Sequence, residues 1–289
     1  MSAMGDSSMN DIDSSMNDTI MIRKVNITHK GGGFFASCNC RLHRIIYCFL
    51  DRNDCLFLPI VNTSGMFDMY KIDNDKDITY EFFEHYNNID ENIIGLDRNS
   101  IKYDINNGFQ YDNYKDLQYE YILPFVKKYF TPSSKILDIH YFFIQKYNID
   151  VENTVGIYYR GTDKYIETPL ASFESVYNKL NEVLEKENPG MQILVQTDSG
   201  QFLDYMKEKC IDDKIIVIAE NGISYTNKGI HNEKTNKENY VDMHYLLSTF
   251  LILSKSKHLI CSSSNCSIWM MYYRGGAENV YQSLNGKWL

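Results

Sequence analysis

The sequence lacks several features that define large classes of proteins. It has no basic excess, because 29 Lys and Arg stand against 38 Asp and Glu for a formal net charge of −9. Duplex nucleic acid is therefore disfavoured as the main partner, since its binding requires a basic face that neutralises phosphates. No apolar run is long enough to span a membrane, so we expect no transmembrane segment.

The N-terminal stretch lacks the pattern of a secretory signal. Residues 1–19 are rich in Ser, Asp, Asn and Met, with no basic stretch followed by an apolar core. We expect a disordered tail over residues 1–19 and a cytoplasmic protein.

The seven cysteines lack a metal-binding pattern. Their number is odd, and the closely spaced pair Cys38 and Cys40 fits no zinc template. We expect ordinary thiols in a reducing compartment and no metal site.

What is present is a globular composition in a chain of useful length. The 289 residues are 44% hydrophobic and 23% charged, which is typical of a folded protein. This length accommodates two ordinary α/β domains or one large one.

The first half opens with a strand, a glycine loop and a helix. We expect strands over residues 20–27 and 56–61, and apolar residues at helical spacing predict a helix from Cys40 to Leu50. The glycine loop between the first strand and the helix has two interpretations. It either allows a ligand to approach backbone amides closely, or it is a plain turn. Its spacing is not the dinucleotide fingerprint, which disfavours a Rossmann-type dehydrogenase. The candidate acceptor or phosphate loop is Gly31, Gly32 and Gly33.

The rest of this half is less regular. Residues 70–115 are largely polar and predict loops and irregular structure, and two helices are expected over 116–130 and 135–146. The junction to the second half is expected near residue 150.

The second half alternates strands and helices, which predicts an α/β fold with a parallel, doubly wound sheet. The expected strands are 155–159, 192–197, 214–219 and 258–261, and the expected helices are 170–187, 200–209, 241–256 and 265–273.

Polar clusters follow three of these strands. They are the segments 160–164, 197–199 and 262–265. Because the carboxyl ends of parallel strands share one edge of a sheet, we expect the clusters to converge on one crevice.

Each cluster has a functional and a structural interpretation. The fork of Arg160 suits paired phosphate oxygens, and hydroxyls at a helix start favour an anion or simply cap the helix. Asp163 is expected to fix the loop, either by pairing with Arg160 or Lys164 or by capping the next helix. Asp198 binds a sugar hydroxyl, orients Arg160 or starts a helix. The candidate donor-site residues are Arg160, Thr162, Asp163, Lys164, Asp198, Ser199, Asp242, His244, Ser262, Ser263, Ser264 and Asn265.

Two further features bear on chemistry. Glu167 follows the first cluster and is the candidate proton acceptor for a hydroxyl nucleophile. Asp242 and His244 open the helix that precedes the serine turn, where they read a nucleobase edge or only begin that helix.

In their order and spacing, the three clusters resemble those of the fucosyltransferase superfamily, which includes α1,6-fucosyltransferases, nodulation fucosyltransferases and protein O-fucosyltransferases. Members carry a strand followed by His-X-Arg-Arg-Thr-Asp-Lys, then a strand ending in Thr-Asp-Asp, then a helix and strand ending in a Ser-Ser turn. Here the pieces are Tyr158-Tyr-Arg-Gly-Thr-Asp-Lys164, Thr197-Asp-Ser199 and the stretch from Leu251 to Asn265, and the match covers about residues 150–275.

The resemblance implies a GT-B-like fold with two Rossmann-like domains whose parallel sheets face a cleft. Residues 20–150 would be the acceptor side and residues 151–289 the donor-binding domain. It implies GDP-fucose as donor substrate, inversion at the anomeric carbon, a glycan or glycoprotein acceptor, and neither metal nor cofactor. By matching position, Arg160 would hold the β-phosphate, the turn from Ser262 to Asn265 would bind the diphosphate, and Glu167 matches the base with a one-residue shift.

The chain also departs from the family pattern. Tyr158 replaces the histidine, Gly161 replaces the second arginine, and Ser199 replaces the second acid of Thr-Asp-Asp. At the position where relatives contact guanine through an acid, strict spacing places Thr249 rather than Asp242. The two hypotheses are therefore an inverting fucosyltransferase and a nucleotide-sugar or carbohydrate-binding protein without catalytic activity.

Overall fold

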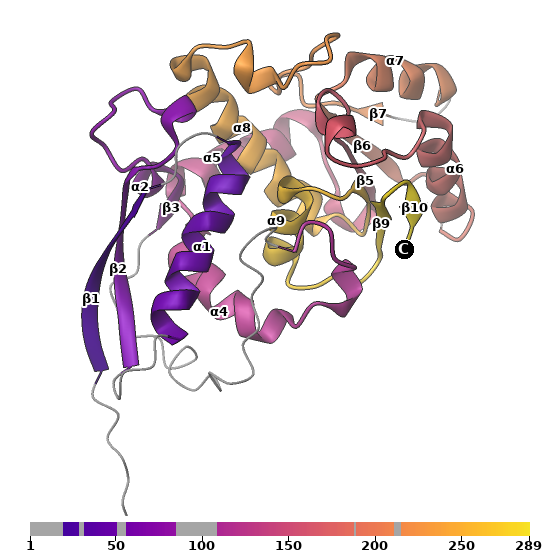
Figure 1. The fold of residues 1–289 in the computed structure, drawn as a ribbon. Coiled ribbons are helices and arrows are strands. Elements are labelled where there is room, and N and C mark those ends of the chain that lie inside the picture. Colours follow the sequence, from indigo (N-terminus) through magenta and orange to yellow (C-terminus); the bar gives the residue numbers. More distant parts are fainter. Residues whose placement is uncertain (1–19, 29–31, 51–55, 85–108, 188, 211–214) are drawn as a thin grey trace, which may run out of the picture.

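A computed structural model describes residues 20–28, 32–50, 56–84, 109–187, 189–210 and 215–289 (Figure 1). The tail predicted over residues 1–19 and the loop residue Gly31 lie outside the described residues. Cys38, Cys40, Cys261 and Cys266 are thiols, as expected.

The first half begins with a parallel β–α–β unit. Strand β1 (Ile20–Thr28) pairs with β2 (Leu56–Gly65), and helix α1 (Phe34–Leu50) connects them. Helix α1 begins earlier than the expected Cys40, because Phe34 and Phe35 at its start are also buried. Figure 1 shows α1 lying between the two strands and the rest of the molecule.

The segment that follows is mostly helical and short-stranded. Its elements are η1 (Asp68–Tyr70), α2 (Thr79–Phe82), β3 (Phe83–Glu84), η2 (Tyr114–Asp116), α4 (Tyr119–Tyr129), β4 (Thr131–Pro132), α5 (Ser134–Tyr147) and η3 (Val151–Asn153). Strands β3 and β4 pair antiparallel.

The second half is built on a six-stranded sheet of order β10-β9-β8-β5-β6-β7, in which only β10 runs antiparallel to its neighbour. The strands are β5 (Thr154–Tyr159), β6 (Gln192–Thr197), β7 (Ile215–Ile216), β8 (His258–Ser262), β9 (Val280–Leu284) and β10 (Lys287–Trp288). The parallel α/β sheet was predicted, whereas β9 and β10 were not.

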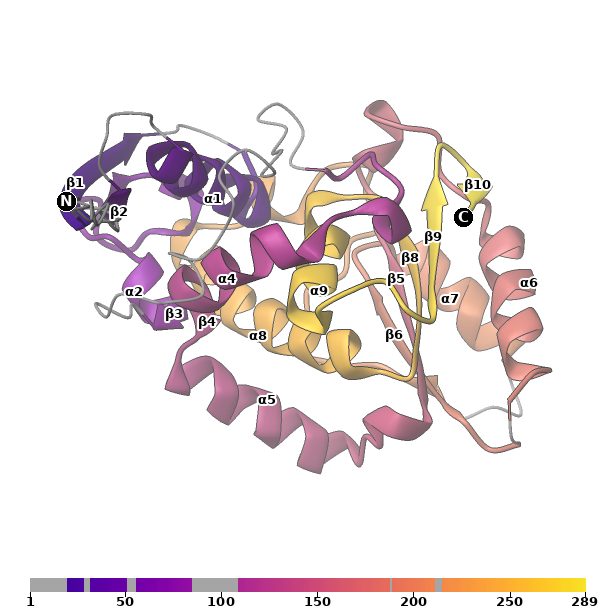
Figure 2. The ribbon, with the colours of Figure 1, turned by 90° about the horizontal axis from the view of Figure 1, so that it is seen from below.

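Helices cover both faces of this sheet. They are α6 (Phe173–Leu184), α7 (Gly200–Lys209), α8 (Asn236–Lys255) and α9 (Asn265–Arg274), with single turns η4 (Lys164–Ile166) and η5 (Ile230–Asn232). Figure 2 shows α6 and α7 on one face, and α8 and α9 on the other. No helix within the described ranges has the length and apolar character needed to cross a membrane.

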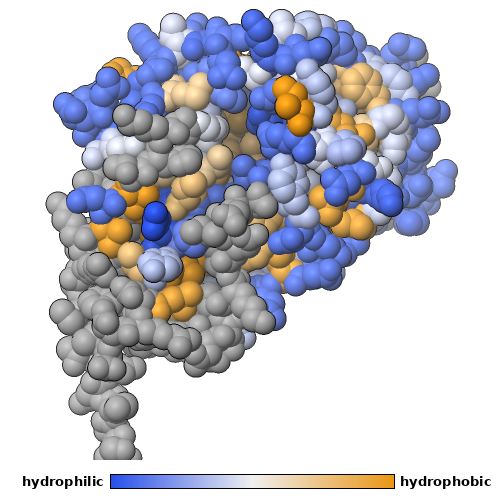
Figure 3. Space-filling view, in the orientation of Figure 1, coloured by the Kyte–Doolittle hydropathy of each residue, from blue (hydrophilic) through white to orange (hydrophobic). Residues whose placement is uncertain are grey.

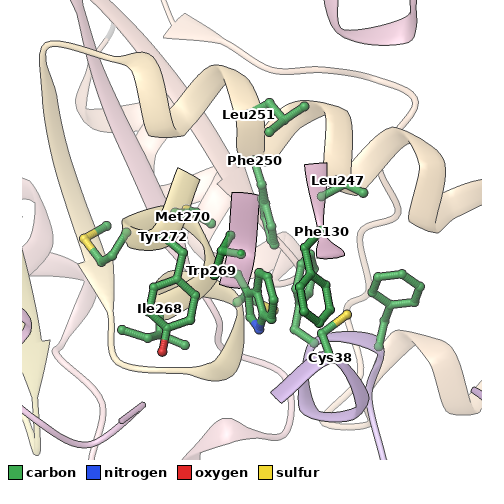
Figure 4. Packing of buried hydrophobic residues seen from close by; sticks show 14 of the residues in the cluster. Cys38, Phe130, Leu247, Phe250, Leu251, Ile268, Trp269, Met270 and Tyr272 are labelled. Carbon is green, nitrogen blue, oxygen red and sulfur yellow. The ribbon is translucent and has the colours of Figure 1, made fainter. Parts of the chain in front are cut away.

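One apolar cluster joins the two halves of the chain. Trp269 is fully buried, and its ring centroid lies 4.6 Å from that of Phe130, while Phe35 lies 5.2 Å from Phe250 (Figure 4). The indole Nε1 of Trp269 donates a 2.8 Å hydrogen bond to Asn39 on α1. Burying such rings stabilises the fold by about 1.5–3 kcal/mol each, so this cluster holds α1 firmly against α8 and α9. The domain division at residue 150 stays a prediction.

The strand register brings the predicted polar clusters together. Tyr159 pairs with Thr197 on β6, and Tyr158 pairs with Cys261 on β8. The three strands therefore end at the same edge of the sheet, immediately before Arg160, Asp198 and the serine turn.

Candidate active site

A cleft of about 290 Å³ opens at this edge of the sheet. Its volume is near the lower end of the roughly 300–1,000 Å³ that is typical of small-molecule sites. It is lined by Gly32, Gly33 and the start of α1, and by residues that follow β5, β6 and β8. Figure 3 shows this face of the molecule hollowed beside the start of α1. Gly32 has φ 86°, a left-handed conformation that glycine adopts without strain.

Arg160 is the first residue after β5 and lines the cleft. Its Nη2 donates a 2.8 Å hydrogen bond to Asp163, as the sequence predicted, and about a fifth of its side chain is exposed. Its Nε is buried, and no described atom accepts a hydrogen bond from it. A partly buried guanidinium that lines a cleft is suited to an anionic ligand.

Asp198 holds the loop that follows Arg160. Its Oδ1 accepts a 2.7 Å hydrogen bond from the amide of Gly161, and its Oδ2 accepts one of 2.7 Å from the Thr162 hydroxyl. Both oxygens are therefore used within the protein, on the two residues that follow Arg160. Asp198 also lines the cleft, as Arg160 does.

Steric crowding explains why residue 161 is a glycine. A Cβ there would lie 2.6 Å from the ring of Tyr159 and 3.0 Å from the Cβ of Ser199. The first contact is shorter than real Cβ atoms show and the second is tight, so a residue with a Cβ would require the Tyr159 ring to shift. Ser199 in turn caps α7 by accepting a hydrogen bond from the amide of Phe202.

The serine turn is divided between the interior and the cleft. Ser262 and Ser263 are buried away from the cleft, and the Ser263 hydroxyl donates a 2.9 Å bond to the carbonyl of Ser283. Ser264, Asn265 and Cys266 line the cleft.

The hydroxyl of Ser264 is itself committed to the helix. It caps α9 by accepting a 3.1 Å hydrogen bond from the amide of Ser267, within a reciprocal capping box. The first amides of α9, those of Asn265 and Cys266, have no intrahelical acceptor and give this end of the helix a partial positive charge. The backbone, rather than the hydroxyls, is therefore what this wall offers an anion.

Lys164 and Glu167 form a second polar group in the cleft. The buried Nζ of Lys164 donates to Glu167 at 2.5 Å and to Gln110 at 3.0 Å, and the Tyr111 hydroxyl donates to the same Glu167 oxygen at 2.8 Å. Burial raises the pKa of Glu167, but the hydrogen bonds from Lys164 and Tyr111 outweigh it and leave the pKa below its ordinary value. Glu167 is therefore ionised at neutral pH and is able to accept a proton.

The structure separates Asp242 from His244. Asp242 lines the cleft and forms an ion pair with Lys234. His244 is not among the cleft residues. It is 2% exposed, contacts the ring of Phe82 at 4.3 Å, and its Nδ1 lies 2.8 Å from the carbonyl of Tyr240. Burial lowers its pKa to about 4, so the ring is neutral and Nδ1 donates. His244 therefore packs in the interior. The prediction that Asp242 and His244 begin this helix is wrong, because α8 starts at Asn236 with Thr235 as its N-cap.

Several cleft residues were not predicted from the sequence. They come from η1, β6, the segment after β7 and α8, and the tertiary fold brings their side chains together at the site. Burial and the charge of Arg160 lower the pKa of His231, which keeps this ring neutral. The unpredicted residues with polar side chains are Tyr70, Gln196, Asn221, His231 and Asn239.

No cluster of three or more His, Cys, Asp or Glu side chains arranged to hold a metal ion is found in the part of the chain that the structure describes.

Comparison with known proteins gives structural matches only. No protein-family model matches the chain, and no curated protein matches its sequence. Two crystal structures of NodZ α1,6-fucosyltransferase, one soaked with GDP-fucose and one co-crystallised with GDP, superimpose with a TM-score of 0.55 each, at 13% and 12% identity. Both alignments cover 94% of this chain, and 98% and 97% of NodZ respectively.

A third match is a mutant of FUT1 from Arabidopsis thaliana in complex with GDP. It aligns at 12% identity over 56% of this chain and 35% of that protein, with a TM-score of 0.36. The NodZ matches establish that the chain has a fucosyltransferase-like, GT-B-like α/β fold, which confirms the predicted fold class.

Proposed function

We propose that this protein is a metal-independent, inverting glycosyltransferase that transfers fucose from GDP-fucose to a hydroxyl of a glycan or glycoprotein. One observation carries the proposal: Arg160 and the start of α9 line the same cleft at the sheet edge. The crystal structures of NodZ with GDP-fucose and GDP support the choice of donor.

In this proposal the diphosphate lies between two positive walls. The guanidinium of Arg160 faces one side, and the amides of Asn265 and Cys266 face the other. When the bond between the anomeric carbon and the β-phosphate oxygen breaks, negative charge grows on the departing phosphate. Fixed donors aimed at that charge lower the barrier without a metal ion.

Glu167 is the proposed proton acceptor. The acceptor hydroxyl attacks the anomeric carbon from the face opposite the departing phosphate, which inverts the configuration, and its proton passes to the Glu167 carboxylate. The hydrogen bonds from Lys164 and Tyr111 keep Glu167 ionised and fix its orientation beside Arg160. They also weaken it as a base, so the acceptor hydroxyl must be held close for transfer to occur.

The test combines binding and turnover. Calorimetry with GDP and GDP-fucose should show binding to the purified chain, and a GDP-release assay with a panel of glycans should show transfer that persists in EDTA. A screen of other nucleotide sugars should give slower release. Strict dependence on manganese, or absence of any nucleotide binding, would contradict the proposal.

The second candidate is a nucleotide-sugar-binding protein without turnover. Tyr158 stands at the position of the family histidine and is buried, and its hydroxyl interacts with the thiol of Cys266. The second family cation is absent at Gly161. Binding of GDP-fucose with neither hydrolysis nor transfer to any glycan would favour this candidate.

A further inference from the structure

The end of the cleft beyond the two positive walls carries an unused hydrogen-bond acceptor. Asn221 lines the cleft and is 7% exposed. Its Oδ1 is buried, and no described donor reaches it. An unsatisfied buried acceptor costs about 1–3 kcal/mol. A ligand that donates to this atom recovers that cost.

Neighbouring residues fix which end of the amide is unused. The Nδ2 of Asn221 donates to Gln196 at 2.6 Å and to the Thr249 hydroxyl at 2.8 Å. The Thr249 hydroxyl donates its hydrogen to the carbonyl of Tyr245 at 2.9 Å, so it can only accept a hydrogen bond from Asn221. The amide nitrogen must therefore face Thr249, and Oδ1 is the unused end.

A second acceptor lies close by on the same wall. A Cβ added at Gly222, the residue after Asn221, would lie 2.8 Å from Nζ of Lys234, 3.4 Å from Oδ2 of Asp242 and 3.4 Å from Ile230. Asp242 and Ile230 also line the cleft. Lys234 neutralises Asp242 through Oδ2, so the carboxylate does not repel a neighbouring anion strongly.

Apolar side chains line the cleft as well. They are those of Ile230, which lies near Gly222 and Asp242, and of Met243 and Leu246 on α8. Apolar walls with a few fixed polar groups are typical of sites for flat aromatic rings. The charged phosphates are matched by Arg160 and α9, which leaves this end for the base of the nucleotide.

The pattern of acceptors selects among bases. Guanine presents two adjacent donors, N1–H and the N2 amine, whereas adenine pairs its one amine with a ring acceptor, and uracil flanks N3–H with two carbonyls. A wall that offers two acceptors satisfies guanine and leaves an acceptor facing an acceptor with the other bases.

We propose that Asn221 determines the base specificity of the site by accepting a hydrogen bond from the Watson–Crick edge of guanine, with Asp242 as the second acceptor. This assignment rests on the proposed function, because it takes the ligand to be a nucleoside diphosphate. Thr249 and Gln196 are positioning residues that hold the Asn221 amide in the required orientation.

The first experiment uses the wild-type full chain and needs no mutation. Calorimetry with GDP, IDP, ADP and UDP compares bases that differ in their donors, since IDP lacks only the N2 amine. We expect IDP to bind several-fold more weakly than GDP, and ADP and UDP to bind at least about tenfold more weakly, because each buried hydrogen bond is worth about 1–3 kcal/mol. Equal affinity for GDP and ADP would overturn the assignment.

The second experiment places the effect on Asn221. Asn221→Leu keeps the size of the side chain and removes the acceptor, and should lower GDP affinity about tenfold while changing ADP affinity little. Asn178→Leu makes the same change at an exposed position on α6 and is the matched control. Thr249→Val should give an intermediate loss for GDP alone, because it releases the amide.

The outcomes separate the two proposals. Equal loss of GDP and ADP affinity in Asn221→Leu would mean that the residue contacts ribose or phosphate, or only supports the wall, and would overturn the base assignment. Failure of every nucleoside diphosphate to bind the wild type would overturn the proposed function together with this assignment. If Asn221→Leu does not fold, the GDP, IDP and ADP affinities of the wild type still decide the case.

Discussion

The turn after β5 and the turn after β8 have the same local pattern but present different groups to the cleft. Each is a polar turn that follows a parallel strand. After β5, the turn presents the side chain of Arg160, and Asp198 fixes its loop. After β8, the hydroxyls of Ser263 and Ser264 turn inward, and the turn presents the start of a helix. A run of serines beside a binding site therefore does not tell how many of their hydroxyls contact the ligand.

The difference predicts opposite results for mutations on the two walls. Side-chain changes after β5 should remove function and spare the fold. Hydroxyl changes after β8 should weaken the fold and spare binding, because the amides of α9 remain.

The largest effect is expected from Arg160→Ala. Removing a donor aimed at developing charge should lower kcat by about 100- to 1,000-fold, while the melting temperature changes little because the residue is not part of the core. Steady-state kinetics and thermal unfolding would measure both.

Arg274→Ala is the control with the reverse expectation. Arg274 donates to the carbonyls of Ser254, Ser256 and Lys257 at 2.6–3.1 Å and is not a cleft residue. Its loss should lower the free energy of unfolding by about 1–3 kcal/mol and leave kcat unchanged. Wild-type turnover in Arg160→Ala would remove that residue from the mechanism.

Asp198→Ala should have the next largest effect. Without the carboxylate, the loop of Gly161 and Thr162 loses two hydrogen bonds, and we expect kcat/KM to fall about 10- to 100-fold through misplacement of Arg160. Asp198→Asn retains one acceptor and should recover much of the activity. If the asparagine variant were as impaired as the alanine variant, a positioning role would be insufficient.

The pH dependence of transfer tests the Lys164–Glu167 pair. Because the pKa of Glu167 lies below its ordinary value of 4.5, the acid limb of the pH–rate profile should fall below that pH. The depressed pKa also means that the pair stabilises the fold above the unfolded pKa, and that this contribution is lost as pH falls through the folded pKa. Lys164→Met should move the acid limb to higher pH. An unmoved limb in this variant would assign the titration to another group.

The smallest effect is expected from Ser264→Ala. Loss of an N-cap costs about 1 kcal/mol, so chemical denaturation should show a modest decrease in stability. GDP affinity measured by calorimetry should stay within about twofold, since the free amides of α9 carry the positive end of the helix. A large loss of GDP affinity with unchanged stability would instead indicate that the Ser264 hydroxyl contacts the ligand.

The sequence predicted those parts of the fold that follow local rules. Short β-branched and aromatic runs such as Val155–Tyr159 marked the parallel strands, and parallel strands bring their carboxyl ends together. Strand β9, with the sequence Val-Tyr-Gln-Ser-Leu, was missed because a short, partly polar stretch carries no clear period.

The site was harder to predict because position along the chain does not tell where a side chain points. Ser264 was equally compatible with capping and anion binding, and the choice depends on Ser267 one turn later. His244 and Asp242 are two residues apart on α8, and the helix turns them toward different surroundings. Asn221 and His231 lie in a polar loop with no motif, so only the fold brings them to the cleft.

The apolar cluster around Trp269 has a consequence for how ligands enter and leave. Phe35 and Asn39 on α1 contact α8 and α9 directly, so moving the two halves apart would break an aromatic contact and a buried hydrogen bond together. A wide opening between the two halves is therefore disfavoured. We expect a ligand to enter and leave the cleft through an opening of nearly constant width, at a rate set by small rearrangements of the residues around that opening.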